Sequence, residues 1–179
     1  MKILLHTCCA PCTTYCRKVL EEEGIGVTGY FYNPNIHPYK EFERRRDTMK
    51  EYAAKTGFDV IYYDVYEMED FIRNVVFRED ERCRFCYYMR LKKAAYAAKS
   101  GGFEGFSTTL LISPYQKHEL IREVAERVSE ESSIPFIYRD FRQGYRDSVR
   151  MSRELGLYRQ PYCGCIYSEK ERYLGQKNK

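Results

Sequence analysis

The chain has 179 residues, eight cysteines and a formal net charge of +4. This length allows one domain to bury a core unaided, so we expect a single α/β domain over residues 1–179. No stretch approaches the roughly 18 consecutive apolar residues of a membrane span, and the apolar run after Met1 is too short for a signal peptide. The composition therefore predicts a cytoplasmic protein with no membrane partner.

Strands and helices are predicted to alternate along the chain, on the basis of apolar periodicity and of Gly and Pro punctuation. In chain order, the first part contains a strand over 2–6, a helix over 11–23, a strand over 27–32, a helix over 38–55 and a strand over 59–63. The remainder contains helices over 67–76 and 80–99, a strand over 105–110, a helix over 116–131, a strand over 134–138, a helix over 145–155 and a short terminal helix.

Repeated βα units predict a doubly wound, mostly parallel, five-stranded sheet of the Rossmann-like or HUP-like kind. In such sheets, ligands bind beyond the carboxyl ends of the strands. Several polar or thiol side chains follow the predicted strands directly: Cys8, Cys9, Asn33, Asn35, Asp64, Thr108 and Thr109. We therefore expect a cysteine-rich metal site at this edge of the sheet, closed by a Cys-Gly-Cys loop and a short helix over residues 158–179.

Seven of the eight cysteines fall into three groups, Cys8-Cys9-Ala10-Pro11-Cys12, Cys83-Arg84-Phe85-Cys86 and Cys163-Gly164-Cys165. In a reducing compartment, such groups indicate metal binding or redox catalysis rather than structural disulfides. A structural zinc site is the main alternative, but such sites usually pair their ligands on short loops, in domains that need the metal to fold. The remaining cysteine, Cys16, has no partner at motif spacing and is expected to pack in the interior.

The first two groups are suited to an iron–sulfur cluster. Cys83 and Cys86 begin a predicted helix, and the helix N-terminus and the nearby Arg90 both favour thiolate. Cys8 and Cys9 are adjacent, so they point in different directions and can ligate different irons of one cubane. These four cysteines supply the four thiolates that a [4Fe-4S] cluster usually takes.

The sequence leaves alternative roles for two further candidate ligands and for the third cysteine group. Cys12 lies one turn into the first helix and is a fifth thiol candidate. Asp64 is a candidate oxygen ligand or a helix N-cap. Cys163 and Cys165 are suited either to an easily reduced disulfide or to a mononuclear metal that binds a substrate oxygen, and such an additional iron ion stays an alternative.

The distribution of positive charge makes a nucleic-acid partner plausible. Between residues 139 and 159 there are six arginines against three acidic residues, and the chain has 18 tyrosines for stacking on bases. A solvated helix surface explains the same charges. The loop after the first strand has no glycine, so adenylation by a phosphate-binding loop is not expected.

Motifs along nearly the whole chain resemble the epoxyqueuosine reductase QueH family. They are Leu4-Leu5-His6-Thr7-Cys8-Cys9-Ala10-Pro11-Cys12, Asn33-Pro34-Asn35-Ile36 with Pro38 and Glu41, Arg82-Cys83 with Cys86-Tyr87 and Arg90-Leu91, Thr108-Thr109-Leu110 with Ser113-Pro114, and Tyr158-Arg159-Gln160 with Tyr162-Cys163-Gly164-Cys165. In one departure, Arg142-Gln143 precede Gly144-Tyr145 where the family tends to carry paired lysines.

The resemblance implies reductive removal of the epoxide oxygen from epoxyqueuosine at the wobble position of tRNA. It implies a cobalamin-independent oxidoreductase with a [4Fe-4S] cluster, with or without a further iron. On this basis we expect Cys163 and Cys165 to be the catalytic redox pair, supplied by an electron donor that the sequence does not identify. Candidate substrate-binding residues are Asn33, Asn35, Arg90, Thr108, Thr109, Arg159 and Tyr162.

Two alternatives to this activity stay open. The first is a cluster-dependent tRNA thiolase, which would add sulfur rather than remove oxygen. The second is a non-catalytic, metal-containing module that binds the anticodon stem-loop of tRNA.

Overall fold

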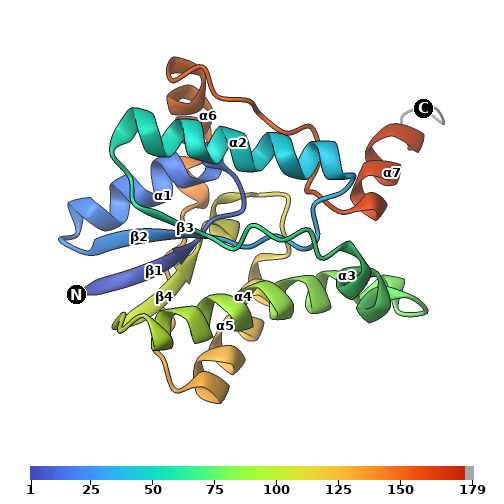
Figure 1. Cartoon of the computed structure of the whole chain (residues 1–179), viewed down its shortest axis with the longest axis horizontal. Coiled ribbons are helices and arrows are strands. Elements are labelled where there is room, and N and C mark those ends of the chain that lie inside the picture. The colour runs from blue at the N-terminus through green and yellow to red at the C-terminus, as the bar shows by residue number, and fades with distance from the viewer. Residues whose placement is uncertain (176–179) are drawn as a thin grey trace.

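A computed structural model describes residues 1–175 of the chain as a parallel four-stranded sheet covered by helices on both faces (Figure 1). The strand order is β3-β2-β1-β4, with β1 Lys2–His6, β2 Gly26–Phe31, β3 Val60–Tyr62 and β4 Gly105–Thr108. The α-helices are α1 Ala10–Glu22, α2 Tyr39–Thr56, α3 Met68–Val75, α4 Arg82–Ser100, α5 His118–Ser132, α6 Tyr145–Glu154 and α7 Ile166–Leu174. The expected α/β class and parallel sheet are confirmed.

The two faces of the sheet are covered by different sets of helices. In Figure 1, α1, α2 and α6 lie on one side of the strands, and α4 and α5 lie on the other. Short 3₁₀ turns, Glu79–Glu81, Thr109–Ile112 and Arg142–Gly144, connect some of these elements. None of the described helices is long and apolar enough to cross a membrane.

The central strand, β1, is buried at every position after Lys2. Its residues Ile3, Leu4 and Leu5 are fully buried, because a central parallel strand is covered on both faces and is therefore apolar throughout rather than alternating. In the strand register, His6 lies opposite Tyr30 of β2 and Thr108 of β4. The carboxyl ends of these three strands consequently meet at one edge of the sheet.

The prediction of a fifth strand over residues 134–138 is wrong. This segment forms a single parallel bridge, between Phe106 and Phe136. The Phe106 N–H donates to the Pro135 carbonyl, and the Ile137 N–H donates back to Phe106. Pro135 has no N–H of its own, so the segment cannot extend a regular ladder in that direction. Residues 1–175 therefore contain four strands.

The fourth strand is shorter than predicted for a local reason. It ends at Thr108, whose side-chain oxygen accepts a hydrogen bond from the backbone N–H of Leu110. A threonine that caps the following turn in this way competes with the continuation of the strand. Thr109 consequently belongs to a 3₁₀ turn, and this turn directs the chain past the loop between β1 and α1.

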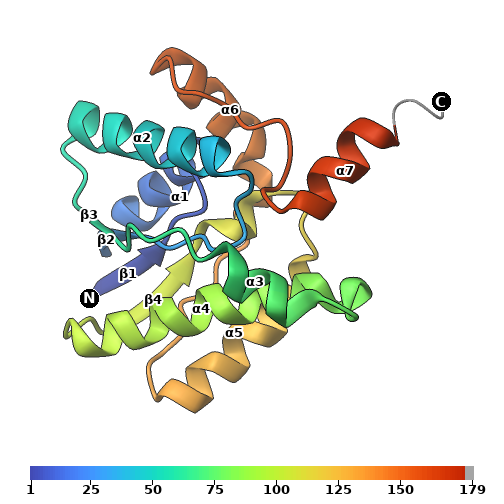
Figure 2. The same cartoon turned by 45° about the vertical axis from the view of Figure 1, so that its right-hand side comes forward.

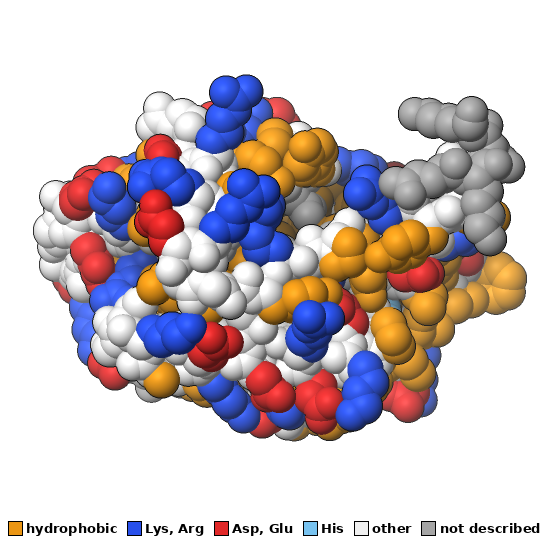
Figure 3. Space-filling view, turned by 90° about the horizontal axis from the view of Figure 1, so that it is seen from above, with side chains coloured by type: hydrophobic (Ala, Val, Ile, Leu, Met, Phe, Trp, Pro, Cys, Tyr) orange, Lys and Arg blue, Asp and Glu red, His pale blue; other side chains and the backbone are white. Residues whose placement is uncertain are grey.

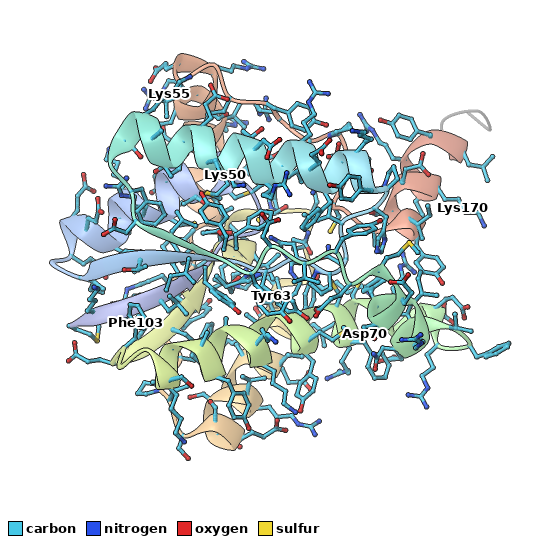
Figure 4. The ribbon with its side chains drawn as sticks, in the orientation of Figure 1. Lys50, Lys55, Tyr63, Asp70, Phe103 and Lys170 are labelled. Atoms are coloured by element: carbon cyan, nitrogen blue, oxygen red, sulfur yellow. The ribbon has the colours of Figure 1, made fainter. Side chains whose placement is uncertain are left out.

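The C-terminal segment lies against two separate parts of the fold. Figure 2 shows α7 beyond the ends of the strands, in the space between α2 and α3. Cys165 and Tyr167 pack against the buried cluster of Phe71, Val75 and Cys86. At the other end of α2, the Lys55 amino group donates to the Leu155 carbonyl at the end of α6 (Figure 4). The last part of the predicted closing segment, residues 176–179, lies outside the described residues.

The packing of α4 on the sheet generates a stability prediction. Leu91 is fully buried on the sheet-facing side of α4. Leu91→Ala removes buried methyl groups and leaves a cavity, so we expect it to lower the free energy of unfolding by about 2–5 kcal/mol. Tyr96→Ala, at an exposed position of the same helix, is the control and should cost less than about 0.5 kcal/mol. Urea unfolding followed by circular dichroism measures both values, and equal losses would contradict the packing.

Candidate metal and redox site

The first cysteine group lies in the tight connection between β1 and α1. Cys9 has extended backbone angles and immediately precedes Ala10, the first residue of α1. Pro11 suits the first helical turn, where a backbone N–H would have no partner within the helix. Because Cys12 lies in the same turn, the sulfur atoms of Cys8, Cys9 and Cys12 all lie within 4.8 Å of one another. This group is compact enough to hold a metal ion.

The three thiols of this group differ in how readily they ionise. Hydrogen bonds with the Cys12 and Cys9 thiols lower the pKa of Cys8 well below its ordinary value. Burial raises the pKa of Cys9 to about 12. The positive end of the α1 dipole also favours negative charge at this position. Cys8 is therefore the first thiolate, and a bound cation must displace the proton of Cys9.

The end of β4 supports the first cysteine group from the side. The backbone N–H of Cys8 donates to Thr109 Oγ1 at 3.0 Å, and that hydroxyl donates to Cys8 Sγ at 3.2 Å. Thr108 Oγ1 lies 2.9 Å from His6 Nδ1, and His6 Nε2 lies 3.1 Å from the Tyr32 carbonyl. Burial lowers the pKa of His6 to about 3, so its ring is neutral at pH 7.

A buried arginine connects the three cysteine groups. Arg90 of α4 has almost no solvent exposure. Its Nη2 donates to Asn33 Oδ1 at 2.8 Å, and its Nη1 lies 3.7 Å from Cys86 Sγ. Although burial opposes the charge, the pKa of Arg90 is raised, because Cys86, Cys8 and Cys163 interact with it electrostatically. One member of each cysteine group thus acts on the same guanidinium.

The third cysteine group lies in the loop before α7. Cys163 is exposed, and the Gln116 side-chain amide donates to its sulfur at 3.0 Å. Cys165 precedes α7, and its sulfur accepts a hydrogen bond from the backbone of the first turn of that helix. Cys165 also packs beside Cys86. The loop therefore connects Gln116, through Cys163, with α4, which carries the second cysteine group.

The Cys-Gly-Cys loop is held from α2 by a second buried arginine, Arg45, which is 2% exposed. Its Nη1 donates to the Cys163 carbonyl at 2.8 Å, and its Nη2 donates to the Tyr162 carbonyl at 3.0 Å. Its Nε donates to Glu41 Oε1 at 2.6 Å, an ion pair within α2. Charge-assisted hydrogen bonds of this kind are about twice as strong as neutral ones. We refer to these contacts as the Arg45 clamp.

The residue between the two cysteines has to be glycine. Gly164 has a φ of +150°, and a Cβ atom there would lie 2.9 Å from Asn35 Nδ2. The Gly164 carbonyl accepts from the His37 N–H at 2.9 Å, and the Tyr162 hydroxyl donates to the His37 carbonyl. Neither polar atom of the buried Asn35 side chain has a partner within residues 1–175. The loop thus packs on the segment that connects β2 to α2.

A cavity of about 600 Å³ opens beside these groups. Its lining includes Cys8, Cys12, Cys163 and the aromatic rings of Tyr115 and Tyr145. Small-molecule sites usually have volumes of about 300–1,000 Å³ and combine apolar walls with a few polar groups. The cavity is therefore large enough for one nucleoside-sized group, which would lie next to thiols from two of the three cysteine groups.

The predicted substrate-binding residues divide into two sets. Tyr162 and Thr109 line the cavity, and the exposed Arg159 precedes a lining residue. Four others are buried and do not line it: Asn33, Arg90 and Thr108, which are hydrogen-bonded to other protein groups, and Asn35. Asn33, for example, also donates from Nδ2 to the Thr7 carbonyl. The prediction that these four side chains contact substrate stays untested, and their burial is better suited to supporting the residues of the site.

Asp64 is placed at the surface rather than among the cysteines. Its carboxylate accepts from Arg46 at 2.9 Å and lies 3.6 Å from the Lys50 amino group. It does not cap α3, whose N-cap residue is Glu67. Within residues 1–175, the compact group of candidate metal ligands contains Cys8, Cys9 and Cys12 alone.

Sequence reasoning did not assign roles to Arg45, Gln116 and Gln160. Gln160 Nε2 donates to Cys9 Sγ at 2.8 Å, from the last part of the chain to the first. Gln160 belongs to the motif that ends in the third cysteine group, and its place in that motif is the sequence feature that could have indicated a role at the site. Arg45 belongs to a run of three arginines, Arg44-Arg45-Arg46, and its burial has no signature in the local sequence.

The chain is therefore an α/β protein with a parallel sheet and a candidate metal site, in which three thiols gather beside the carboxyl end of β1. The family model described as "Epoxyqueuosine reductase QueH" matches residues 3–171. The chain therefore belongs to the QueH family, and the expected family membership is confirmed.

Three curated relatives named "Epoxyqueuosine reductase QueH" are similar over most of the chain. The protein of Dehalococcoides mccartyi is 45% identical over 96% of this chain and 94% of its own length. That of Streptococcus pyogenes is 39% identical over 94% of this chain and 70% of its own length. That of Thermotoga maritima is 37% identical over 95% of this chain and 91% of its own length.

One solved structure shares the fold at low sequence identity. It is described as a predicted subunit of a tRNA methyltransferase from Methanocaldococcus jannaschii. The TM-score is 0.54 at 14% identity, over 85% of this chain and 75% of that chain. This similarity supports the α/β architecture alone.

The Arg45 clamp generates a prediction about the mobility of the Cys-Gly-Cys loop. Arg45→Met removes two charge-assisted hydrogen bonds to the loop, each worth about 1.5–3 kcal/mol. Local opening should therefore increase at least about tenfold, since 1.4 kcal/mol is a factor of ten. We expect faster alkylation of Cys165, the less exposed of the two thiols, in the metal-free protein, measured by peptide mass spectrometry.

A matched control for this experiment lies next in the sequence. Arg46→Met removes a guanidinium that pairs with Asp47 and Asp64 at the surface, and it should leave the alkylation rates unchanged. Arg45→Lys should recover part of the protection. Unchanged rates in a folded Arg45→Met variant would contradict the clamp.

Proposed function

We propose that this protein catalyses the reduction of epoxyqueuosine to queuosine at the wobble position of tRNA. Membership of the QueH family, whose relatives cited above carry the name epoxyqueuosine reductase, supports this activity. The observation that carries it is the cavity beside the cysteine groups, which is lined by Cys8 and Cys163 and large enough for one modified nucleoside. The protein is accordingly an oxidoreductase of tRNA modification.

The reaction requires two electrons and two protons. Both C–O bonds of the epoxide break, a C=C bond forms between the two carbons, and the oxygen leaves as water. In our proposal, oxidation of the Cys163 and Cys165 thiols to a disulfide supplies both electrons and both protons. An external electron donor then reduces the disulfide to restore the two thiols. The Gln116 amide, 3.0 Å from Cys163 Sγ, orients that sulfur at the cavity wall.

The chemistry of the donor set fits an iron–sulfur cluster. Soft thiolates select iron–sulfur centres, and we propose that Cys8, Cys9, Cys83 and Cys86 would hold a [4Fe-4S] cluster. Arg90 reaches Cys86 directly and acts on Cys8, so its charge would offset part of the negative charge of the thiolates. When bound, such a cluster supplies one-electron transfers without cobalamin.

Cys12 is not one of the four proposed cluster ligands, although it lies beside two of them. Its sulfur lies within 4.8 Å of the Cys8 and Cys9 sulfurs, so it is the fifth candidate thiol, an alternative to either of them in the assignment of the cluster ligands. An additional iron ion is the alternative form of the proposal. The Cys163 and Cys165 thiolates would hold it, and it would supply a Lewis acid beside the epoxide.

The anticodon stem-loop of tRNA is the proposed macromolecular substrate. Lys117, Arg159 and Arg172 lie at or next to cavity-lining positions, and none of them forms a salt bridge within residues 1–175. Several other arginines are paired with acidic neighbours, as Arg142 is with Asp140. Figure 3, which looks onto the face of α2 and α6, shows Lys and Arg side chains interspersed with Asp and Glu. Phosphate contacts are therefore expected mainly around the cavity.

The central prediction concerns turnover. Anaerobically purified protein, incubated with a chemical reductant and tRNA that carries epoxyqueuosine, should yield queuosine, and nucleoside mass spectrometry should show the loss of one oxygen atom. A gain of sulfur would instead identify a tRNA thiolase. Binding of the tRNA without any change in nucleoside mass would identify a non-catalytic module.

The division of the cysteines generates a second prediction. Cys163→Ala should keep iron and inorganic sulfide but lose turnover by at least about a hundredfold, because the two-electron pair is broken. Cys8→Ala should lose most of the iron and sulfide. Cys16→Ala, a buried cysteine outside the three groups, is the control and should keep both. Loss of the cluster in Cys163→Ala with retention in Cys8→Ala would reverse the assignment.

The buried charge of Arg90 generates a third prediction. Arg90→Gln removes a positive charge near Cys86, so the reduced, more negative form of the cluster should be less stable. With an effective dielectric constant of about 20, the expected fall in midpoint potential is roughly 50–100 mV. Arg90→Lys keeps the charge and should restore most of the potential. A redox titration followed by visible absorption measures it, and equal potentials in all three proteins would rule out this role.

A further inference from the structure

Tyr115 is a large aromatic side chain exposed at the margin of the cavity. It is 82% exposed, and it lines the cavity together with Tyr145. The two rings meet edge to face, with their centroids 5.8 Å apart and an interplanar angle of 82°. An aromatic ring that buries so little surface contributes little to the core. Its exposure next to a substrate cavity is therefore better explained by a partner.

The backbone around Tyr115 is restrained by its neighbours in the sequence. Pro114 restricts the preceding backbone, and the Tyr115 N–H donates to the Ser113 hydroxyl at 3.3 Å. The next residue, Gln116, is anchored through the hydrogen bond that it accepts from the Tyr87 hydroxyl at 2.6 Å. Because the backbone is restrained here, the position from which the ring projects changes little on binding, and a tyrosine loses little further conformational freedom when it stacks.

Positive charge lies close to the aromatic pair. Arg159 interacts electrostatically with Tyr145 and has no salt bridge within the described residues. An exposed aromatic face beside an unpaired guanidinium is the combination by which proteins bind single-stranded nucleic acid, since the ring stacks on a base and the cation contacts the backbone. Tyr115, Tyr145 and Arg159 are called the rim site below.

We propose that the rim site binds the nucleotide next to the modified one, with its base stacked on the exposed face of Tyr115. This inference rests on the proposed function. The cavity holds about 600 Å³, enough for one modified nucleoside but not for its neighbours. Entry of that nucleoside separates it from the stacked anticodon loop, and Tyr115 replaces the stacking that the neighbouring base loses.

The absence of tryptophan from this chain allows a direct test. Tyr115→Trp introduces a single tryptophan, whose fluorescence should be quenched when an anticodon stem-loop RNA that carries epoxyqueuosine is added to the cluster-containing protein. Tyr96→Trp, at an exposed position of α4 outside the cavity lining, is the control and should show no quenching by the same RNA.

Binding of the labelled stem-loop, measured by fluorescence anisotropy, completes the test. Stacking on one base is worth a factor of about five to a hundred in affinity, so Tyr115→Leu should weaken binding within that range and Tyr115→Phe should not. An abasic site at one of the two flanking positions should remove the difference between Tyr115→Leu and wild type. Equal effects of Tyr115→Leu on the intact RNA and on both abasic RNAs would overturn the proposal, as would unquenched fluorescence in Tyr115→Trp.

These outcomes are separate from those that test the activity. In one outcome, the RNA binds to wild type and quenches Tyr115→Trp, but wild type leaves the epoxide unchanged. This outcome contradicts the proposed reaction and supports the rim site. In the other outcome, wild type reduces the epoxide, and Tyr115→Leu binds the RNA with the same affinity as wild type. This outcome supports the proposed reaction and contradicts the rim site.

Discussion

The charge of one buried guanidinium group constrains the whole site. Arg90 lies beneath the cavity with almost no exposure, and its described partners are one amide oxygen and one sulfur. A buried cation is strongly destabilising unless negative charge compensates it. The cysteine sulfurs that act on Arg90 come from all three groups along the chain. Thiolates held by a metal centre would supply that negative charge. The burial of Arg90 and the clustering of the cysteines are therefore consistent with one another.

Burial also explains why the thiols and a metal would depend on each other. Burial raises the pKa of Cys9 and of Cys86 to about 12, so in the metal-free protein both carry protons at pH 7. A metal cation displaces such protons and leaves anionic sulfur. Metal binding and the ionisation of Cys9 and Cys86 would therefore depend on each other.

The arrangement of the Cys-Gly-Cys loop is determined by contacts with distant parts of the chain. Cys163 and Cys165 lie on a segment whose position depends on the Arg45 clamp, on the His37 backbone and on the absence of a side chain at Gly164. The cluster of Phe71, Val75 and Cys86 then receives Cys165 from the other side. Two opposite ends of the sequence thereby share one cavity wall, and the chemistry proposed for the cavity depends on this closure.

The sequence by itself determined the alternation of strands and helices, the placement of Cys8 and Cys9 at a strand end, and the family, because periodicity and motif spacing are local properties. It did not determine the extent of pairing of residues 134–138, which depends on a missing N–H at Pro135 and on the register with Phe106. Nor did it separate Thr109 and Tyr162, which line the cavity, from Asn33, Arg90 and Thr108, which support it. That separation, and the role of Arg45, were decided by tertiary structure alone, because the burial of a side chain depends on neighbours that lie far away in the sequence.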